Sequence, residues 1–175
     1  MRDFCTDYAN ALFCVAEEEN AEKTYLDQLS VIRSVIKEND DFIKLLDCPA
    51  IGKEERLSVA EECFAGAEHG IISFIKLLTE KRRAFCLKKC IDIFERLYDD
   101  KNNIERAVCI TAVPLSLQQN EQLAGKLEKI TGKSIILTNQ VNPHIMGGVL
   151  LRLKNREING SVALRLKEIE KAIRI

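Results

Sequence analysis

The chain has 175 residues, of which 46% are hydrophobic and 30% charged, with a formal net charge of -1. This mixture is typical of a globular protein and excludes a disordered chain. Because the near-neutral charge gives no basic field to attract phosphates, we expect no nucleic-acid partner. The strongest apolar run, residues 71–75, stops at Lys76. A bilayer crossing needs roughly 20 apolar residues, so we expect no membrane span.

The N-terminus and the cysteines bear on the compartment of the protein. Residues 1–7 carry two acids and no long apolar run, so we expect neither a secretory signal nor a transit peptide. The seven cysteines are odd in number and scattered along the chain. We therefore expect free thiols that serve as small hydrophobic side chains in the cytoplasm.

The first part of the chain predicts one helix after another, because apolar residues recur at helical spacing. The short third helix ends before Pro49, since the residue before a proline is pushed out of the helical region. A polar linker at residues 99–103 closes this part. The predicted helices cover residues 3–18, 21–37, 42–46, 53–64, 71–80 and 84–98.

A sequence pattern typical of β-strands begins after the linker. Residues 104–113 predict a strand that Pro114 stops. Ser116 and Gln119 then form a capping box, in which the serine hydroxyl accepts a free amide hydrogen at the helix start. This helix is predicted to end at Gly132, a residue suited to a left-handed cap.

The last part alternates short β-rich runs with turn residues. The runs cover residues 134–137 and 148–153, and Asn159 followed by Gly160 is typical of a turn. Ser161 is predicted to cap a final helix. Its apolar stripe consists of Val162, Leu166, Ile169 and Ile173.

Together these patterns predict a mostly α fold with two domains. A helical bundle is expected at residues 1–103 and a small α+β domain at residues 104–175. No internal repeat or low-complexity tract is present in the sequence.

One short motif superficially suggests nucleotide binding. Residues 131–134 read TGKS, but a phosphate-binding loop needs a glycine at the position of Leu127. A predicted helix precedes Gly132 and a strand follows it, the reverse of the order that aims loop amides at a phosphate. We therefore expect no nucleotide and no other cofactor.

Metal and catalytic sites are not indicated either. Cys86 and Cys90 lie one helical turn apart and could share a metal, but the sequence has no Cys-x-x-Cys pair. His69 and His144 belong to different halves, and no nucleophile is spaced to cooperate with His144. The basic cluster at residues 81–83 is interpreted as a solvated face. Core packing explains the two cysteines better, so we predict no metal site and no catalytic site.

Two helices carry more apolar surface than one packed face requires. Residues 71–79 spread apolar side chains over an arc of roughly 220°, at ~100° per residue. In the first helix, Phe13 lies between Ala9 and Ala16, small residues that let another helix approach closely. Either the helix at 71–79 is central and surrounded by neighbours, or the two helices form an apolar groove for a partner's amphipathic helix.

Five segments carry a recognisable pattern in chain order. Residues 8–13 read YANALF, residues 74–83 read FIKLLTEKRR and residues 112–116 read AVPLS. Residues 141–149 read VNPHIMGGV, and residues 158–162 read INGSV. Taken together, they resemble the ATP synthase delta subunit family, called the oligomycin-sensitivity-conferring protein in mitochondria, over essentially the whole chain.

Two positions depart from the pattern of that family. Asn142 and Asn159 stand where the family has aspartates in V-D-P and I-D-G-S. Both asparagine and aspartate form local turn hydrogen bonds, so we expect the turns to persist without the carboxylate charges.

The resemblance implies a six-helix N-terminal domain, in which a groove between the first and fifth helices grips the N-terminal helix of an alpha subunit. The groove residues expected in this sequence are Tyr8, Ala11, Leu12, Val15, Ile71, Phe74, Ile75 and Leu78. The C-terminal domain would hold the peripheral-stalk b subunits. Its expected signature residues are Pro114, Ser116, Gly132, Pro143, Gly147, Gly148, Gly160 and Ser161.

The implied function is mechanical. A non-catalytic stator subunit at the cytoplasmic face of the cell membrane would tie the catalytic head of an F-type ATP synthase to its peripheral stalk. It would resist rotor torque during proton-driven ATP synthesis. The alternative is a generic helical adaptor unrelated to ATP synthase. We predict that a polar residue at Leu12 or Ile75 abolishes head binding without unfolding the bundle.

Overall fold

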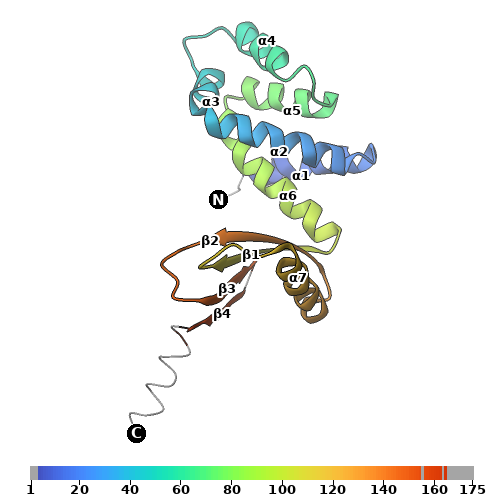
Figure 1. The fold of residues 1–175 in the computed structure, drawn as a ribbon. Coiled ribbons are helices and arrows are strands. Elements are labelled where there is room, and N and C mark those ends of the chain that lie inside the picture. The colour runs from blue at the N-terminus through green and yellow to red at the C-terminus, as the bar shows by residue number, and fades with distance from the viewer. Residues whose placement is uncertain (1–3, 155, 163, 165–175) are drawn as a thin grey trace. The chain divides into compact units, whose positions relative to one another are not determined.

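The computed structural model describes residues 4–154, 156–162 and 164 (Figure 1). The chain divides into two compact units, Met1–Tyr98 and Asp99–Ile175. The predicted mostly helical character, with a small sheet in the second half, is confirmed. The helices of the first part are α1 (Phe4–Glu18), α2 (Glu22–Glu38), α3 (Asp40–Asp47), α4 (Lys53–Cys63), α5 (His69–Glu80), the 3-10 turn η1 (Ala84–Cys86) and α6 (Leu87–Lys101).

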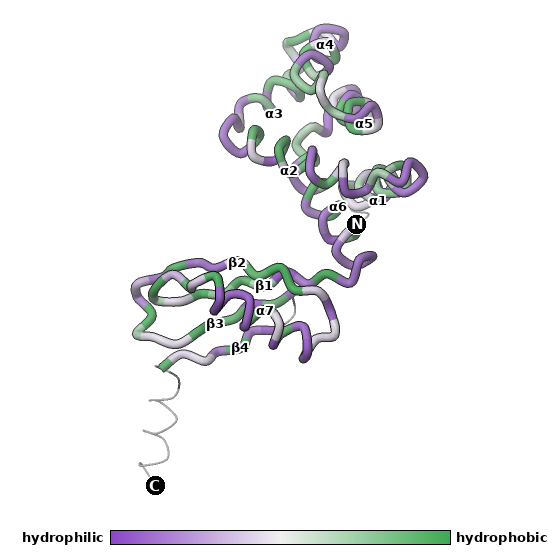
Figure 2. The backbone as a smooth tube through the Cα atoms, turned by 45° about the vertical axis from the view of Figure 1, so that its right-hand side comes forward, coloured by the Kyte–Doolittle hydropathy of each residue, from purple (hydrophilic) through white to green (hydrophobic). Residues whose placement is uncertain are grey.

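Aromatic side chains occupy the centre of the first unit. Tyr25 of α2 and Phe94 of α6 are fully buried, and their stacked ring centroids lie 6.4 Å apart. Phe13 of α1 meets Phe94 edge-on at 5.3 Å. In Figure 2, hydrophobic and hydrophilic residues alternate along the helices, as expected where each helix buries one face. Aliphatic residues complete this core, including Leu29, Leu46, Ile71, Ile75, Leu78, Leu87 and Ile91.

A buried arginine joins three helices of this unit. Arg56 of α4 is almost fully buried. Its Nη1 donates to the backbone oxygen of Leu46 in α3 at 2.9 Å and to that of Thr79 in α5 at 3.2 Å. Because these carbonyls lie near helix C-termini, the guanidinium satisfies acceptors that have no partner within their own helix.

The helix that was predicted from residue 84 starts with a tighter turn, η1, and α6 follows it. Both carboxylate oxygens of Asp47 accept backbone amide hydrogens here, from Ala84 at 2.9 Å and from Phe85 at 3.0 Å. The end of α3 therefore fixes the connection between α5 and α6.

The second unit is a four-stranded sheet with one helix. Its strands lie in the order β2-β1-β3-β4, with β1 parallel to β2 and the other neighbours antiparallel. Leu127 of α7 packs with Ala107, Cys109, Ile135 and Leu151 of the sheet in a small core. The elements are β1 (Ile104–Thr111), α7 (Leu117–Thr131), β2 (Ser134–Val141), β3 (Gly148–Leu153) and β4 (Arg156–Ser161).

The ends of α7 confirm the sequence prediction. The Ser116 hydroxyl accepts the amide hydrogen of Gln119 at 3.2 Å, and the Gln119 side chain accepts that of Ser116 at 3.0 Å. Gly132 caps the other end with a left-handed φ of 70°. Both caps satisfy backbone groups that have no intrahelical partner, as their residue types indicate.

The predicted polar linker was wrong in its extent. α6 continues to Lys101, so only residues 102 and 103 form a turn before β1. Asp99 is largely buried in the last turns of the helix and accepts a hydrogen bond from Arg106 Nε at 2.7 Å. A charged run is therefore ordered by a salt bridge that the sequence pattern did not indicate.

The predicted turn at Asn159-Gly160 was also wrong, because both residues belong to β4. There, Gly160 pairs with Val149 and Asn159 pairs with Leu150 of β3. A continuous ladder of six residue pairs joins the two strands. This pairing supplies more backbone hydrogen bonds than a local turn at this position would.

Two further sequence predictions concern the final helix and a membrane span. The predicted final helix falls on residues 161–175 and lies for the most part outside the described residues. None of the described helices is both long enough and apolar enough to pass through a membrane.

Candidate functional site

A groove of about 340 Å³ lies in the first unit, between α1 and α5. Leu12 and Phe74 are buried beneath it, while Val15 and Leu77 expose 38% and 40% of their surface. The groove is lined by Ala11, Leu12, Val15, Glu19, His69, Gly70, Ser73, Phe74 and Leu77. It therefore combines an apolar floor with accessible apolar walls.

The structure brings together four of the eight predicted groove residues, namely Ala11, Leu12, Val15 and Phe74. The other residues predicted on α5 contribute to the core instead, with Ile71, Ile75 and Leu78 at most 1% exposed. Tyr8 is half-buried and lies outside the groove lining. The broad apolar arc of α5 thus serves mainly the core, and one edge of it meets the groove.

Sequence reasoning missed the other five lining residues, of which Glu19 follows α1. On α5 the missed residues are His69, Gly70, Ser73 and Leu77. The spacing from Gly70 to Phe74 to Leu77 follows the helical repeat of one face, so this stripe was available as a signal. Small residues on it, Gly70 and Ser73, leave the space that larger side chains would fill.

Close packing at one end of the groove depends on Gly70. A Cβ at this position would lie 2.1 Å from Tyr25 Oη, a distance that no packed pair of atoms tolerates. Tyr25 in turn donates to Glu19 Oε2 at 2.5 Å. Burial, and next the hydrogen bond to Glu19, raise the pKa of Tyr25 above its ordinary value. The phenol therefore stays protonated and holds the Glu19 carboxylate at the groove wall.

An aromatic and cationic cluster surrounds the start of α1. Arg83 Nη1 donates to Tyr8 Oη at 3.1 Å, and its guanidinium lies 4.3 Å from the ring centroid of Phe4. Arginine over an aromatic face is attracted by the ring quadrupole. This cluster ties the segment after α5 to the first turns of α1, the helix that forms one wall of the groove.

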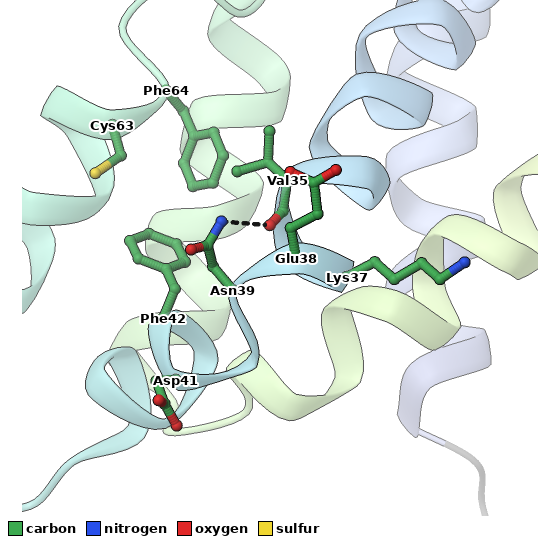
Figure 3. A pocket seen from close by; sticks show the side chains of 8 residues that line it. All are labelled: Val35, Lys37, Glu38, Asn39, Asp41, Phe42, Cys63 and Phe64. Atoms are coloured by element: carbon green, nitrogen blue, oxygen red, sulfur yellow. Dashed lines mark hydrogen bonds between the residues drawn. The ribbon is translucent and has the colours of Figure 1, made fainter.

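A second hollow, of about 620 Å³, lies at the end of α2 beside α3 and the end of α4 (Figure 3). Phe42 and Phe64 form its apolar part, with ring centroids 5.7 Å apart. The Asn39 side-chain amide donates to the Val35 carbonyl at 3.0 Å. Charged side chains of both signs, Lys37, Glu38 and Asp41, complete the lining. None of the predicted groove residues contributes to this hollow.

In the second unit, the signature glycines occupy positions that demand glycine. Gly148 has a φ of 84°, and a Cβ there would lie 2.4 Å from the backbone oxygen of Gly160. The Val162 amide donates to the Gly147 oxygen at 3.0 Å. The two strands therefore approach each other more closely than a side chain at Gly148 would allow.

The remaining signature residues lie in turns, in the caps of α7 and, for Gly160 and Ser161, in β4. Pro114 follows the end of β1, and Pro143 lies in the turn before β3. Asn142 and Asn159 accept backbone amide hydrogens from His144 and Ser161, each at 3.0 Å. The asparagines thus make the local hydrogen bonds expected of the aspartates that they replace.

The described residues contain no cluster suited to a metal ion. Among them, no group of three or more His, Cys, Asp or Glu side chains is arranged to hold a metal ion. Cys86 and Cys90 are buried in the core of the first unit. The groove between α1 and α5 is suited to packing against another protein.

Comparison with known proteins identifies the family. The profile of the family described as "ATP synthase delta (OSCP) subunit" matches residues 6–173. The chain belongs to this family. Its delta-family relatives include the "ATP synthase subunit delta" of Clostridium botulinum (strain Loch Maree / Type A3), 34% identical over 165 residues, with 94% of this chain and 92% of the relative covered.

Two other matches cover nearly the whole chain. The "ATP synthase subunit delta" of Lactobacillus johnsonii is 33% identical, over 98% of this chain and 94% of the relative. A chain in the cryo-EM structure of the Toxoplasma gondii mitochondrial ATP synthase hexamer has a TM-score of 0.73 at 24% identity, with 99% of both chains covered. This likeness shows that the two chains share a fold.

Proposed function

We propose that the chain is the delta subunit of an F-type ATP synthase and acts as a stator. In this role it links the catalytic head to the peripheral stalk and has no catalytic site of its own. The observation that carries the proposal is the apolar groove between α1 and α5, in a chain whose family profile spans residues 6–173.

The groove is the attachment site for the head. An amphipathic helix from the N-terminus of an alpha subunit inserts apolar side chains between Val15 and Leu77, above Leu12 and Phe74. In such helix-in-groove contacts, the anchoring side chains of the bound helix are spaced three and four residues apart. The exposed walls support this assignment, because Val15 and Leu77 are the accessible large apolar residues of the lining.

The six α-helices before residue 102 form the bundle that carries the groove, and the second unit holds the b subunits of the peripheral stalk. With one attachment made, the second becomes intramolecular and benefits from a high effective concentration. Two modest interfaces can therefore hold against torque, because simultaneous release of both is slow.

The subunit works as a peripheral component at the cytoplasmic face of the cell membrane. Without a tether the head would turn with the rotor, so that proton flow would no longer drive ATP synthesis. No cofactor or nucleic acid takes part in this role. The chain contributes rigidity and two binding surfaces.

Reconstitution tests this proposal. Membranes stripped of their head and delta subunit are supplied with the head alone, or with the head and this chain. We expect proton pumping coupled to ATP hydrolysis only when the chain is added. A chain that binds neither the head nor the stalk from the same organism, although well folded, would contradict the stator role and favour a helical adaptor outside the synthase.

A further inference from the structure

Three buried cysteines gather where the start of α1 meets the start of α6. Cys5 lies in the first turn of α1, Cys86 ends η1, and Cys90 follows one turn later in α6. The Sγ atoms of Cys5 and Cys86 are 2.8 Å apart, although 81 residues separate the two positions. Cys90 Sγ lies 3.4 Å from the backbone oxygen of Cys5, to which it donates. The thiols of Cys86 and Cys90 thus contact different atoms of Cys5.

We propose that Cys5 and Cys86 are a disulfide-forming pair, an oxidation site in the first unit. Side chains that only fill space keep carbon contacts of about 3.5–4.0 Å. The sulfur atoms of this pair are closer than that, at 2.8 Å. A disulfide bond of about 2.05 Å requires a further approach of only about 0.8 Å. The first turn of a helix accommodates such a shift, because helix ends are the least constrained part of the element.

The reaction is a two-step thiol–disulfide exchange with a low-molecular-weight disulfide such as glutathione disulfide. Cys5, which is 8% exposed and lies in the first turn of α1, loses its proton and attacks one sulfur of the reagent. This step forms a mixed disulfide and releases one glutathione thiolate. Cys86, 2% exposed, then loses its proton and attacks Cys5 Sγ. The second glutathione thiolate leaves, and both thiolates take up the released protons.

The bond would change the unit in which the candidate groove lies. It closes a loop that contains α2, α3, α4 and α5, since its ends are in α1 and η1. Cross-links over long loops restrict the unfolded chain strongly and so stabilise the folded state. The first turn of α1 would be held to η1, and α1 is a wall of the groove.

The other cysteines do not share this geometry. Cys14 and Cys63 are exposed, Cys48 is half-buried and Cys109 lies in the sheet. The exposed pair would react with other molecules of the chain and obscure the result. The test therefore uses the full chain carrying Cys14→Ser and Cys63→Ser.

In the experiment, this background protein is incubated with excess glutathione disulfide at neutral pH. Remaining thiols are alkylated in denaturant, and the peptides are mapped by mass spectrometry. We expect one linkage, between the peptides that carry Cys5 and Cys86, and a rise in Tm of roughly 10 °C or more. Dithiothreitol should reverse both changes.

Three single variants make the test specific. Cys86→Ala and Cys5→Ala should each abolish the linkage and the Tm rise, whereas Cys90→Ala should keep both. Circular dichroism of the reduced proteins establishes that each variant folds, and either of the first two alone suffices for the comparison. Two results would show that the pair is not a disulfide site. In the first, Cys5 and Cys86 are still free to be alkylated after the oxidation. In the second, the Tm rise persists in Cys86→Ala or Cys5→Ala.

Discussion

At the residue scale, the first unit depends on a few polar side chains with assigned partners. Arg56 donates to two backbone oxygens in different helices, and it is only 3% exposed. A buried carbonyl that loses its donor costs the desolvation energy of that group. The positions of Leu46 and Thr79 therefore depend on a residue that composition alone would assign to the surface.

Replacing Arg56 with alanine should destabilise the first unit by about 3 kcal/mol or more, because it removes two hydrogen bonds and leaves a cavity. Urea unfolding monitored by circular dichroism measures this change. Arg96→Ala is the matched control, since Arg96 is exposed and its Nε bonds only to the backbone oxygen of Asp92 in its own helix. The control should stay within about 0.5 kcal/mol of the parent protein. Equal losses in both variants would contradict the bridging role of Arg56.

At the element scale, the sequence predicted the helices better than the strands. Helical spacing located α1 to α5 closely, and the capping box and Gly132 located α7. β4 was missed, because residues 156–161 lack a β-rich pattern and contain Asn159 and Gly160. Its ladder with β3 comes from a tight hairpin in which Leu153 pairs with Arg156, and this strand pairing overrides the local turn preference of Asn159 and Gly160. Register of this kind cannot be read from six residues alone.

The candidate groove was predictable only in part, for a related reason. Hydrophobic residues on two faces of α5 look alike in sequence, whether they meet the core or a partner. The structure separates them: Ile75 is 1% exposed, while Leu77 is 40% exposed. A polar residue at Ile75 or Leu12 would therefore also lie in the core, so a loss of binding in such a variant would not separate a groove contact from unfolding. Val15 and Leu77 replace them as probes of binding.

The close approach of β3 and β4 predicts that alanine at Gly148 lowers the stability of the second unit. Alanine at Gly125, a glycine without close neighbours, is predicted to raise it. Gly148→Ala should destabilise the second unit by at least about 1 kcal/mol, because φ is positive and Gly160 blocks a Cβ. Gly125→Ala in α7 should instead stabilise it by up to about 1 kcal/mol, since nothing lies within 4 Å of the added Cβ. Differential scanning calorimetry compares the two. A stable Gly148→Ala protein would contradict the described strand contact.

At the scale of the whole molecule, the proposed stator role assigns one attachment to each of the two units. The groove in the first unit is defined by its residues and belongs to a chain of the delta family. The assignment of the second unit to the stalk rests on the proposed function. The division of labour predicts that a change in the groove weakens head binding and leaves stalk binding intact.

The most direct test is calorimetric titration of the full chain with a peptide from the alpha-subunit N-terminus of the same organism. We expect one-to-one binding that Leu77→Glu or Val15→Glu weakens at least about tenfold, because a charge would enter a desolvated apolar contact. Val31→Glu is the control, an exposed valine on α2 outside the groove lining. The control should bind like the parent protein. Unchanged affinity in folded Leu77→Glu and Val15→Glu proteins would contradict the groove as the attachment site.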